Sequence, residues 1–370
     1  MIYKRMAIEK ESPEELGYGE IRYNLAESSV SDFRLKELLP GLPDLSLCYT
    51  DHRGKAELRE LIVSGQENLV REDVLLTAGA ASALFIIATT LLSANDHLVV
   101  IRPNYATNIE TPRSAGADIS YIDLNFENGW QPDIAGIEKL IRPSTKYISI
   151  THPHNPTGTL LSRSVLDSLI RLVETRDLYL LVDETYRELS FNPPMPLAAS
   201  LSKKVISVSS VSKAYGLPGL RIGWLVCRDA FLMESFLAAK EQIFIANSVL
   251  DEEIACLFLE NKERYWPGIK SHIDRNFSLL QQWMEKETRL EWIVPSGGVV
   301  CFPRVKDWRR FQAEHFYKHL LNSYGTLVGP GHWFEMPDHY MRIGYAWPQY
   351  GELENGLAAI STALTGSFAD

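Results

Sequence analysis

The sequence has little cysteine, and the few cysteines are scattered. Four occur in 370 residues, at Cys48, Cys227, Cys256 and Cys301, and none belongs to a CxxC pair or a cysteine–histidine cluster. This spacing argues against a disulfide framework and against a zinc site. Reduced thiols in a cytosolic protein are the simplest interpretation.

Long apolar runs and basic blocks are also missing. The uncharged run from Val74 to Asn95 contains hydroxyl residues and glycine, so we interpret it as a strand, a turn and a buried helix rather than a membrane span. The N-terminus is charged and has no signal-peptide-like stretch, which predicts a cytoplasmic location. Lys plus Arg number 37 against 47 Asp plus Glu, a net charge of −10. Nucleic acid and membrane surfaces are therefore poor candidate partners.

Two nucleotide-binding fingerprints are absent as well. The chain contains neither a GxGxxG segment nor a Walker-type loop, so a NAD-type oxidoreductase and a P-loop NTPase lose their main support. Apolar residues make up 45% and charged residues 23%, which are ordinary globular values. A small-molecule enzyme is the interpretation that remains.

Seven short apolar runs, separated by segments with helical spacing, recur up to residue 227. They lie at 73–77, 97–101, 117–123, 146–151, 178–183, 204–210 and 221–227. Near-continuous apolar strands that alternate with helices predict an α/β fold with a mostly parallel seven-stranded sheet. Only VSKAYGLPGL separates the last two runs, which is too short for a crossover helix. We therefore expect the last strand to run antiparallel.

The pattern changes after Cys227. We expect a long helical region over 228–287 with one interruption at Trp266-Pro267-Gly268, followed by turn-rich pieces and helices near 307–323 and 351–364. This predicts a smaller α+β domain, completed by the N-terminal segment because chain ends often meet. The predicted large domain covers 41–264, and the small domain covers 1–40 and 265–370.

A lysine follows the sixth apolar run, in SVSKAYGLPGLRIGW at 210–224. Lys213 lies among small hydroxyl residues and glycines, which suits a Schiff base, because the amine must approach a carbonyl closely and be partly desolvated. Ser210 and Arg221 flank it and could hold a phosphate beside that carbonyl. A surface lysine before a turn is the alternative.

Polar residues also follow two other strands. Asp183 ends the run at 178–183, at the sheet edge where ligands of open α/β folds bind, and its carboxylate could pair with a protonated ring nitrogen. A helix-capping aspartate is the alternative. Asn155, in HPHNPTG, could donate its amide to an anionic oxygen, or could simply belong to a turn.

Small and aromatic residues complete the set of candidates. Ala80 and Ala81, in TAGAAS between a strand and a helix, could offer backbone N–H groups to a phosphate. Tyr105, in RPNYAT, could stack on a flat ring, although structural tyrosines are commoner.

Together these residues resemble the fold-type I, class I/II pyridoxal-phosphate aminotransferases, and the resemblance covers nearly the whole chain. The motifs that carry it are Gly79-Ala80-Ala81, Tyr105, Asn155-Pro156-Thr157-Gly158, Asp183 with Tyr186, Ser210-x-x-Lys213 and Arg221. The resemblance implies that pyridoxal 5′-phosphate (PLP) binds Lys213 as an internal aldimine. It implies transfer of an amino group between an amino acid and a 2-oxo acid.

The same resemblance implies a role for each residue. Asp183 would keep the pyridine nitrogen protonated, and Asn155 and Tyr186 would bond the ring's phenolic oxygen. Tyr105 would stack on the ring. The phosphate would be held by Ser210, Arg221, Tyr49 and the Ala80–Ala81 amides.

Two further matches concern assembly and substrate. Tyr49, in CYTDHRGKAELREL, matches the family tyrosine that reaches the phosphate of the neighbouring subunit, which implies a homodimer. Arg342, in MRIGYA, matches the arginine that clamps the substrate α-carboxylate, where Asn155 would also contact the substrate. A structural ion pair is the alternative for Arg342.

SKAYGLPGLRIGW, PSGGVVCFPR and MRIGYA are similar to the branch of the family that contains capreomycidine synthase, which cyclises a hydroxylated arginine derivative. A PLP-dependent lyase, cyclase or oxidase acting on a basic amino acid is therefore the alternative to a transaminase. A regulatory protein derived from the fold is a third possibility, disfavoured by the retained Lys213, Asp183 and Arg342.

The chain departs from the family pattern in one substrate-facing segment. Asn24-Leu25-Ala26-Glu27-Ser28-Ser29 stands where many members carry Gly-x-Pro. Glu27 is either a solvated loop glutamate or a group that attracts the cationic end of an arginine- or ornithine-like substrate. No arginine occurs between Arg228 and Arg264, where dicarboxylate-specific relatives supply a second clamp. An aspartate- or glutamate-like side chain is therefore a less attractive substrate.

Overall fold

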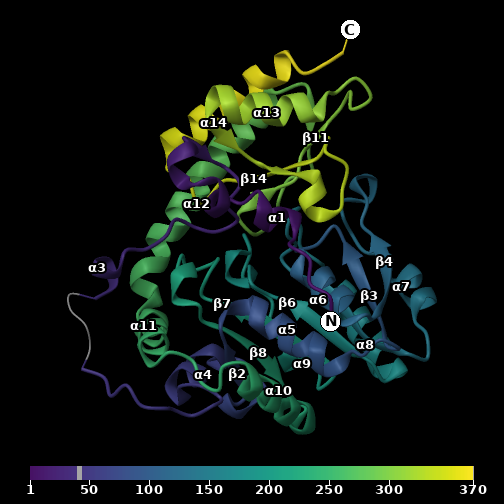
Figure 1. Cartoon of the computed structure of the whole chain (residues 1–370), viewed down its shortest axis with the longest axis vertical. Helices are drawn as coiled ribbons and strands as arrows, with labels where there is room; N and C mark the ends of the chain where they lie inside the picture. The colour runs from purple at the N-terminus through teal and green to yellow at the C-terminus, as the bar shows by residue number, and fades with distance from the viewer. Residues whose placement is uncertain (40–43, 370) are drawn as a thin grey trace.

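The computed structural model describes residues 1–39 and 44–369. A seven-stranded sheet forms the lower half of the molecule in Figure 1. Its strands lie in the order β2 (Val74–Thr77), β8 (Gly223–Cys227), β7 (Val205–Ser210), β6 (Tyr179–Asp183), β5 (Thr145–Thr151), β3 (His97–Arg102) and β4 (Asp118–Asp123). Strand β8 is antiparallel to both neighbours and the other pairs are parallel. The predicted α/β class is confirmed, including the antiparallel last strand.

Helices cover both faces of this sheet. Leu98 and Val100 of β3 belong to one buried cluster with side chains of α5, α6 and α10, whereas Val99 and Ile101 belong to another with α7 and α8. This division follows from strand geometry, since successive side chains point to opposite faces. The helices of this half are α4 (Ala56–Val63), α5 (Gly79–Leu91), α6 (Thr107–Ala115), α7 (Ile134–Leu140), α8 (Arg163–Arg176) and α9 (Ala198–Leu201).

The helical region predicted over 228–287 consists of three helices, namely α10 (Ala230–Ile243), α11 (Val249–Glu260) and α12 (Lys262–Lys286). The interruption predicted at Trp266-Pro267-Gly268 is wrong, because α12 continues through Pro267. A proline this close to the helix start removes a single backbone hydrogen bond, and Tyr265 and Trp266 pack against the main buried cluster. The helices are separated at 244–248, where Ile245 has a φ of 58°, and at the single turn residue Asn261.

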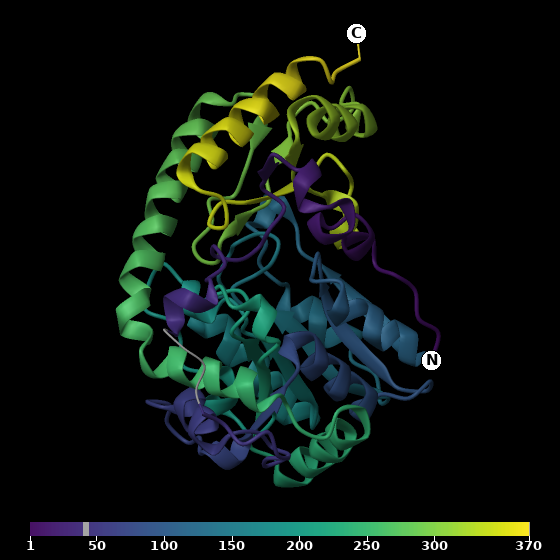
Figure 2. The same cartoon turned by 60° about the vertical axis from the view of Figure 1, so that its left-hand side comes forward.

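Helix α12 runs along one side of the molecule, from the large sheet to three small sheets (Figure 1 and Figure 2). The upper half includes the antiparallel sheet β10 (Val300–Cys301), β14 (Met341–Gly344) and β13 (Gly329–Pro330), the pair β9 (Leu290–Glu291) and β11 (Arg304–Val305), and helices α13 (Ala313–Tyr324), η6 (Gly331–Phe334) and α14 (Tyr350–Thr365).

The N-terminal segment lies against this upper half (Figure 2). It contains α1 (Ala7–Lys10), α2 (Pro13–Leu16), η1 (Tyr18–Glu20), β1 (Tyr23–Asn24) and α3 (Leu35–Leu38). Strand β1 pairs in parallel with β12 (Thr326–Leu327). The predicted boundary between 40 and 41 lies outside the described residues, and the one between 264 and 265 falls inside α12. The division into two domains stays a prediction.

The parallel strands bring polar residues to one edge of the large sheet. Strands β5, β6 and β7 end at Thr151, Asp183 and Ser210, which therefore lie at the same edge. Among the described residues, no helix is both long and apolar enough to cross a membrane, and residues 1–39 and 44–369 contain no cluster of potential metal ligands.

Candidate active site

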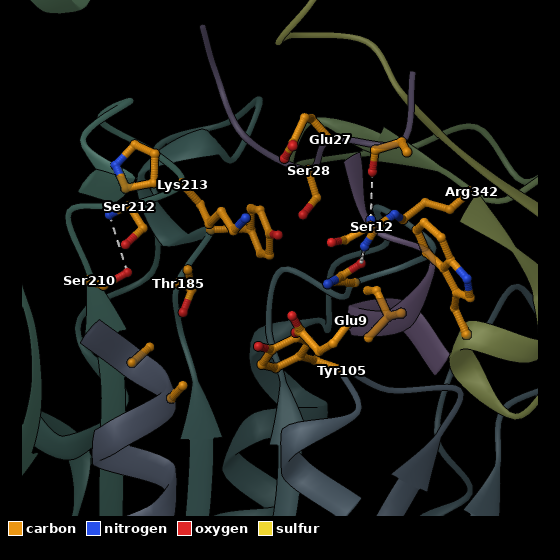
Figure 3. A pocket seen from close by; sticks show the side chains of 18 of the residues that line it. Glu9, Ser12, Glu27, Ser28, Tyr105, Thr185, Ser210, Ser212, Lys213 and Arg342 are labelled. Carbon is orange, nitrogen blue, oxygen red and sulfur yellow. Dashed lines mark hydrogen bonds between the residues drawn. The ribbon is translucent and has the colours of Figure 1, made fainter. Parts of the chain in front are cut away.

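A cavity of about 260 Å³ lies at this edge, between the large sheet, the N-terminal segment and the small sheets. Figure 3 shows Lys213 near its centre, with Ser210 and Ser212 on one side and Arg342 on the other. Eleven of the residues proposed from the sequence line the cavity: Glu27, Ala80, Ala81, Tyr105, Asn155, Asp183, Tyr186, Ser210, Lys213, Arg221 and Arg342. Residues more than 300 positions apart thus share one site.

Lys213 reaches the cavity from the loop between β7 and β8. Its backbone oxygen accepts a 3.1 Å hydrogen bond from the N–H of Val30, which fixes the loop against the N-terminal segment. Burial lowers the pKa of the Lys213 ammonium, an effect that the nearby Glu27 carboxylate partly opposes. The amine is therefore easier to deprotonate than an exposed lysine, as a nucleophile requires.

Asp183 is a buried carboxylate with no basic partner among the described residues. Its Oδ1 accepts bonds from Thr185 Oγ1 at 2.6 Å and from the Thr185 N–H at 3.1 Å. Its Oδ2 receives only a 3.5 Å contact from Asn108 Nδ2. Burial raises the pKa of Asp183, because no nearby cation compensates the lost solvation. A ligand that brings its own positive charge would supply that compensation.

Another group of lining residues is suited to binding an anion. Ala80 and Ala81 lie in the first turn of α5, where unpaired backbone N–H groups and the helix dipole favour negative charge. Ser210 and Arg221 line the same cavity. Gly79 has a φ of +78°, a backbone conformation that favours glycine, and a Cβ there would come within 2.6 Å of Arg221 Nη2.

Arg342 crosses from β14 to the large-sheet side of the cavity. Its Nη1 donates a 3.0 Å bond to Asn155 Oδ1, and its Nη2 donates a 2.7 Å bond to the Ala26 oxygen. Its Nε has no hydrogen-bond partner among the described residues, although the side chain is only 3% exposed. A buried guanidinium with an unpaired donor is suited to binding an anionic group.

Two tyrosines complete the lining near Asp183. Tyr186 is buried, and the loss of solvation raises the pKa of its hydroxyl. Burial likewise raises the pKa of Tyr105, which follows β3. Both hydroxyls therefore stay protonated and able to donate hydrogen bonds.

Tyr49 is the one predicted site residue that the structure places elsewhere. Its side chain is 82% exposed and does not line the cavity of its own chain. The predicted contact across a dimer requires this exposure. Its role in a partner's site stays a prediction.

Several lining residues were not predicted from the sequence. The N-terminal helices contribute Ile8, Glu9, Ser12, Pro13 and Glu14, and η6 contributes Trp333. Nothing in the local sequence indicates that α1 and α2 cover the cavity. Thr185 could have been predicted, because an aspartate side chain often accepts a hydrogen bond from the backbone N–H two residues later.

The N-terminal helices are attached to η6 by one acidic side chain. Glu11 Oε2 accepts a bond from Trp333 Nε1 at 2.6 Å and lies 2.8 Å from His332 Nε2. His332 Nδ1 lies 2.8 Å from Asp338, and the hydrogen bond to Asp338, supported by Glu11, raises the pKa of His332 to about 9. This ion triad holds α1 and α2 over the cavity.

These observations fit pyridoxal phosphate. A phosphate matches the wall of helix N–H groups, serines and Arg221, and a protonated ring nitrogen matches the uncompensated Asp183 carboxylate. Lys213 lies in the same cavity, where its amine could bind the cofactor aldehyde.

Comparisons with known proteins give the same result. The family model for aminotransferase class I and II matches residues 16–360. The chain is 31% identical to capreomycidine synthase from Streptomyces vinaceus, over 79% of this chain and 74% of that protein. It is 28% identical to an arginine–pyruvate transaminase from Pseudomonas aeruginosa, over 77% and 74% of the two chains.

A solved structure agrees along the whole length. A PLP-dependent aminotransferase from Streptococcus suis superposes with a TM-score of 0.91 at 28% identity, covering 100% of both chains. The family match and the presence of Lys213 in the cavity point the same way. The chain belongs to the aminotransferase class I and II family and is a PLP-dependent enzyme.

Proposed function

We propose that the protein transfers an amino group between an amino acid and a 2-oxo acid. The observation that carries this proposal is the placement of Lys213, Asp183 and Arg342 in one cavity. Lys213 supplies an amine, Asp183 a carboxylate for a ring nitrogen, and Arg342 a guanidinium for a substrate carboxylate.

The chain's own residues have separable tasks in this reaction. PLP, when bound, supplies an electron sink that stabilises the negative charge left on the substrate α-carbon. Lys213 Nζ takes the proton from that carbon, for which its lowered pKa favours the neutral amine. Arg342 and Asn155 orient the substrate through its α-carboxylate. Asp183 would keep the ring nitrogen protonated.

Tyr49 supports a homodimer with shared active sites. It lies on a segment tied to α10, since His52 Nδ1 lies 2.6 Å from Glu241 Oε1 and Arg53 donates a 3.0 Å bond to Glu234. Leu47 is 85% exposed on that segment, and Phe231 of α10 is equally exposed. Exposed apolar side chains favour contact with a second copy, which would receive Tyr49 in its phosphate site.

A PLP-dependent cyclase or lyase acting on a basic amino acid is the second candidate. The 31% identity to capreomycidine synthase favours it. The cavity residues discussed above are compatible with both reactions, because each begins with removal of the α-proton.

One experiment separates the two reactions. Holoenzyme is mixed with each of a panel of amino acids, first without and then with a 2-oxo acid, and the product is quantified. A transaminase releases about one equivalent of new 2-oxo acid per site without acceptor and turns over continuously only when acceptor is added. Sustained product formation without acceptor would overturn the proposal in favour of the second candidate. Lys213→Ala, expected to be inactive in both arms, controls for contaminating enzymes.

A further inference from the structure

The cavity wall built by the N-terminal segment carries acids and no base. Its described lining residues include Glu9 of α1, Glu14 of α2 and Glu27 after β1, whereas Lys213 and Arg342 reach the cavity from other elements. Every charged side chain that the N-terminal segment contributes to the described lining is therefore acidic.

The Glu27 carboxylate interacts electrostatically with both Lys213 and Arg342. The charge of Glu14 also acts on it. No hydrogen bond to a described residue supports the half-buried Glu27 side chain. In Figure 3 it lies above Lys213, on the side away from Tyr105. Burial raises the pKa of Glu27 despite the charges of Lys213 and Arg342, so a further cation in the cavity would stabilise the carboxylate.

Glu27 does not stand alone. Glu14 Oε1 accepts a 3.3 Å bond from Tyr18, and Glu14, Glu27 and Asp32 all act electrostatically on that tyrosine. Asp32 already accepts a 3.0 Å bond from Trp347 Nε1. Glu27 and Glu14 are the members of this group that line the cavity.

A second observation concerns Arg342, the residue proposed to bind the substrate α-carboxylate. The Arg342 side chain is 3% exposed, and its Nε has no partner among the described residues. An amino acid whose α-carboxylate engages Arg342 has its amine beside Lys213, so both of these charged groups are already accounted for. Glu27 and Glu14 are left to meet its side chain.

We infer that Glu27, assisted by Glu14, binds the cationic end of a basic amino acid, a guanidinium or an alkylammonium, and so sets the substrate class. This inference rests on the proposed function. An acidic side chain would meet like charges at this wall, and a neutral one would leave both carboxylates unpaired.

The pH dependence follows from the surroundings of Glu27. Burial raises its pKa, the charges of Lys213 and Arg342 lower it, and those of Glu14 and Asp32 raise it, with Tyr18 a further titratable neighbour. A raised pKa means that Glu27 becomes neutral earlier as the pH falls. The KM for a basic substrate should therefore rise toward low pH more than the KM for a neutral one.

The test compares arginine with citrulline, which has the same length and no charge. Single-turnover rates of the holoenzyme give KM and the maximal rate for both. We expect wild type to prefer arginine by roughly tenfold or more in kcat/KM, the size of effect expected for a partly buried ion pair. Glu27→Gln should raise the KM for arginine about tenfold and change the KM for citrulline less than about twofold. Glu27→Asp should recover part of the preference.

Glu15→Gln is the matched control. Glu15 is adjacent to Glu14 in α2, but it pairs with Arg5 at 3.0 Å and does not line the cavity. It should leave the arginine-to-citrulline ratio unchanged, while Glu14→Gln should lower it.

The possible outcomes distinguish failure of the proposed function from failure of the substrate inference. If no amino acid produces a first half-reaction, the proposed function fails. If amino acids react but citrulline equals or exceeds arginine in wild type, or Glu27→Gln affects both equally, the proposed function stands and the substrate inference is overturned.

Discussion

Arg342 Nη1 donates a 3.0 Å hydrogen bond to Asn155 Oδ1, which joins β14 to the loop after β5 across 187 residues of sequence. The same guanidinium donates to the Ala26 oxygen of the N-terminal segment at 2.7 Å. One arginine therefore connects the three parts of the chain that enclose the cavity. Its geometry depends on all three.

Asn155→Ala should weaken substrate binding. Loss of the amide leaves a buried Arg342 donor unpaired, a change worth about 1–3 kcal/mol, and allows the guanidinium to reorient. We expect the KM for the amino acid to rise roughly tenfold or more, measured in single-turnover titrations. Asn355→Ala, on the exposed side of α14, is the control and should have no effect. An unchanged KM in Asn155→Ala would show that this bond does not position Arg342.

Lys213 should carry the cofactor. Borohydride reduction of the purified protein should fix PLP on Lys213, as read by peptide mapping. Lys213→Ala should still bind PLP through the phosphate wall but lose turnover, because no other described lysine lines the cavity. A reduced adduct on another lysine, or none, would refute the assignment.

Tyr49 should act in the partner's site. Tyr49→Phe should weaken PLP binding, by roughly tenfold if the lost bond is charge-assisted. Mixed dimers of Tyr49→Phe and Lys213→Ala subunits regain one native site only if Tyr49 crosses to the partner. We expect the mixture, after subunit exchange, to exceed the summed activity of the two parents at limiting PLP. No gain over that sum, or a fully active monomer, would contradict the shared site.

His332 should stabilise the protein in a pH-dependent way. Its pKa is raised to about 9 by Asp338 and Glu11, so its contribution is fully present below the unfolded value of about 6.5 and is lost as the pH rises through about 9. His332 is partly exposed, so we expect His332→Gln to lower the free energy of unfolding by only about 1 kcal/mol at pH 6. Urea unfolding between pH 6 and 10 should show the difference shrinking toward zero.

His315→Gln serves as the control for that series, since His315 is exposed on α13. It should show no such pH-dependent difference. A difference between wild type and His332→Gln that stays constant up to pH 10 would mean that the ion triad does not contribute through the charge of His332.

The large sheet and most of the residues that line the cavity could be predicted from the sequence alone. The seven apolar runs correspond to the seven strands, because buried parallel strands require nearly continuous apolar side chains. Asp183 and Ser210 could be found because each ends a strand, and Lys213 because it lies three residues after one. Strands of one direction place their ends at one edge. Tyr49 and Arg342 were found only through the family resemblance.

The closure of the cavity by α1 and α2, and the continuity of α12 through Pro267, depend on contacts that form only in the folded chain. Pro267 lies in an unbroken α12 because packing of Tyr265 and Trp266 offsets a local helix-breaking preference. Glu14 became part of the site because Glu11 binds His332 and Trp333, more than 300 residues away. Such contacts leave no periodic or spacing signal, since their energy comes from groups that meet only after the chain has folded.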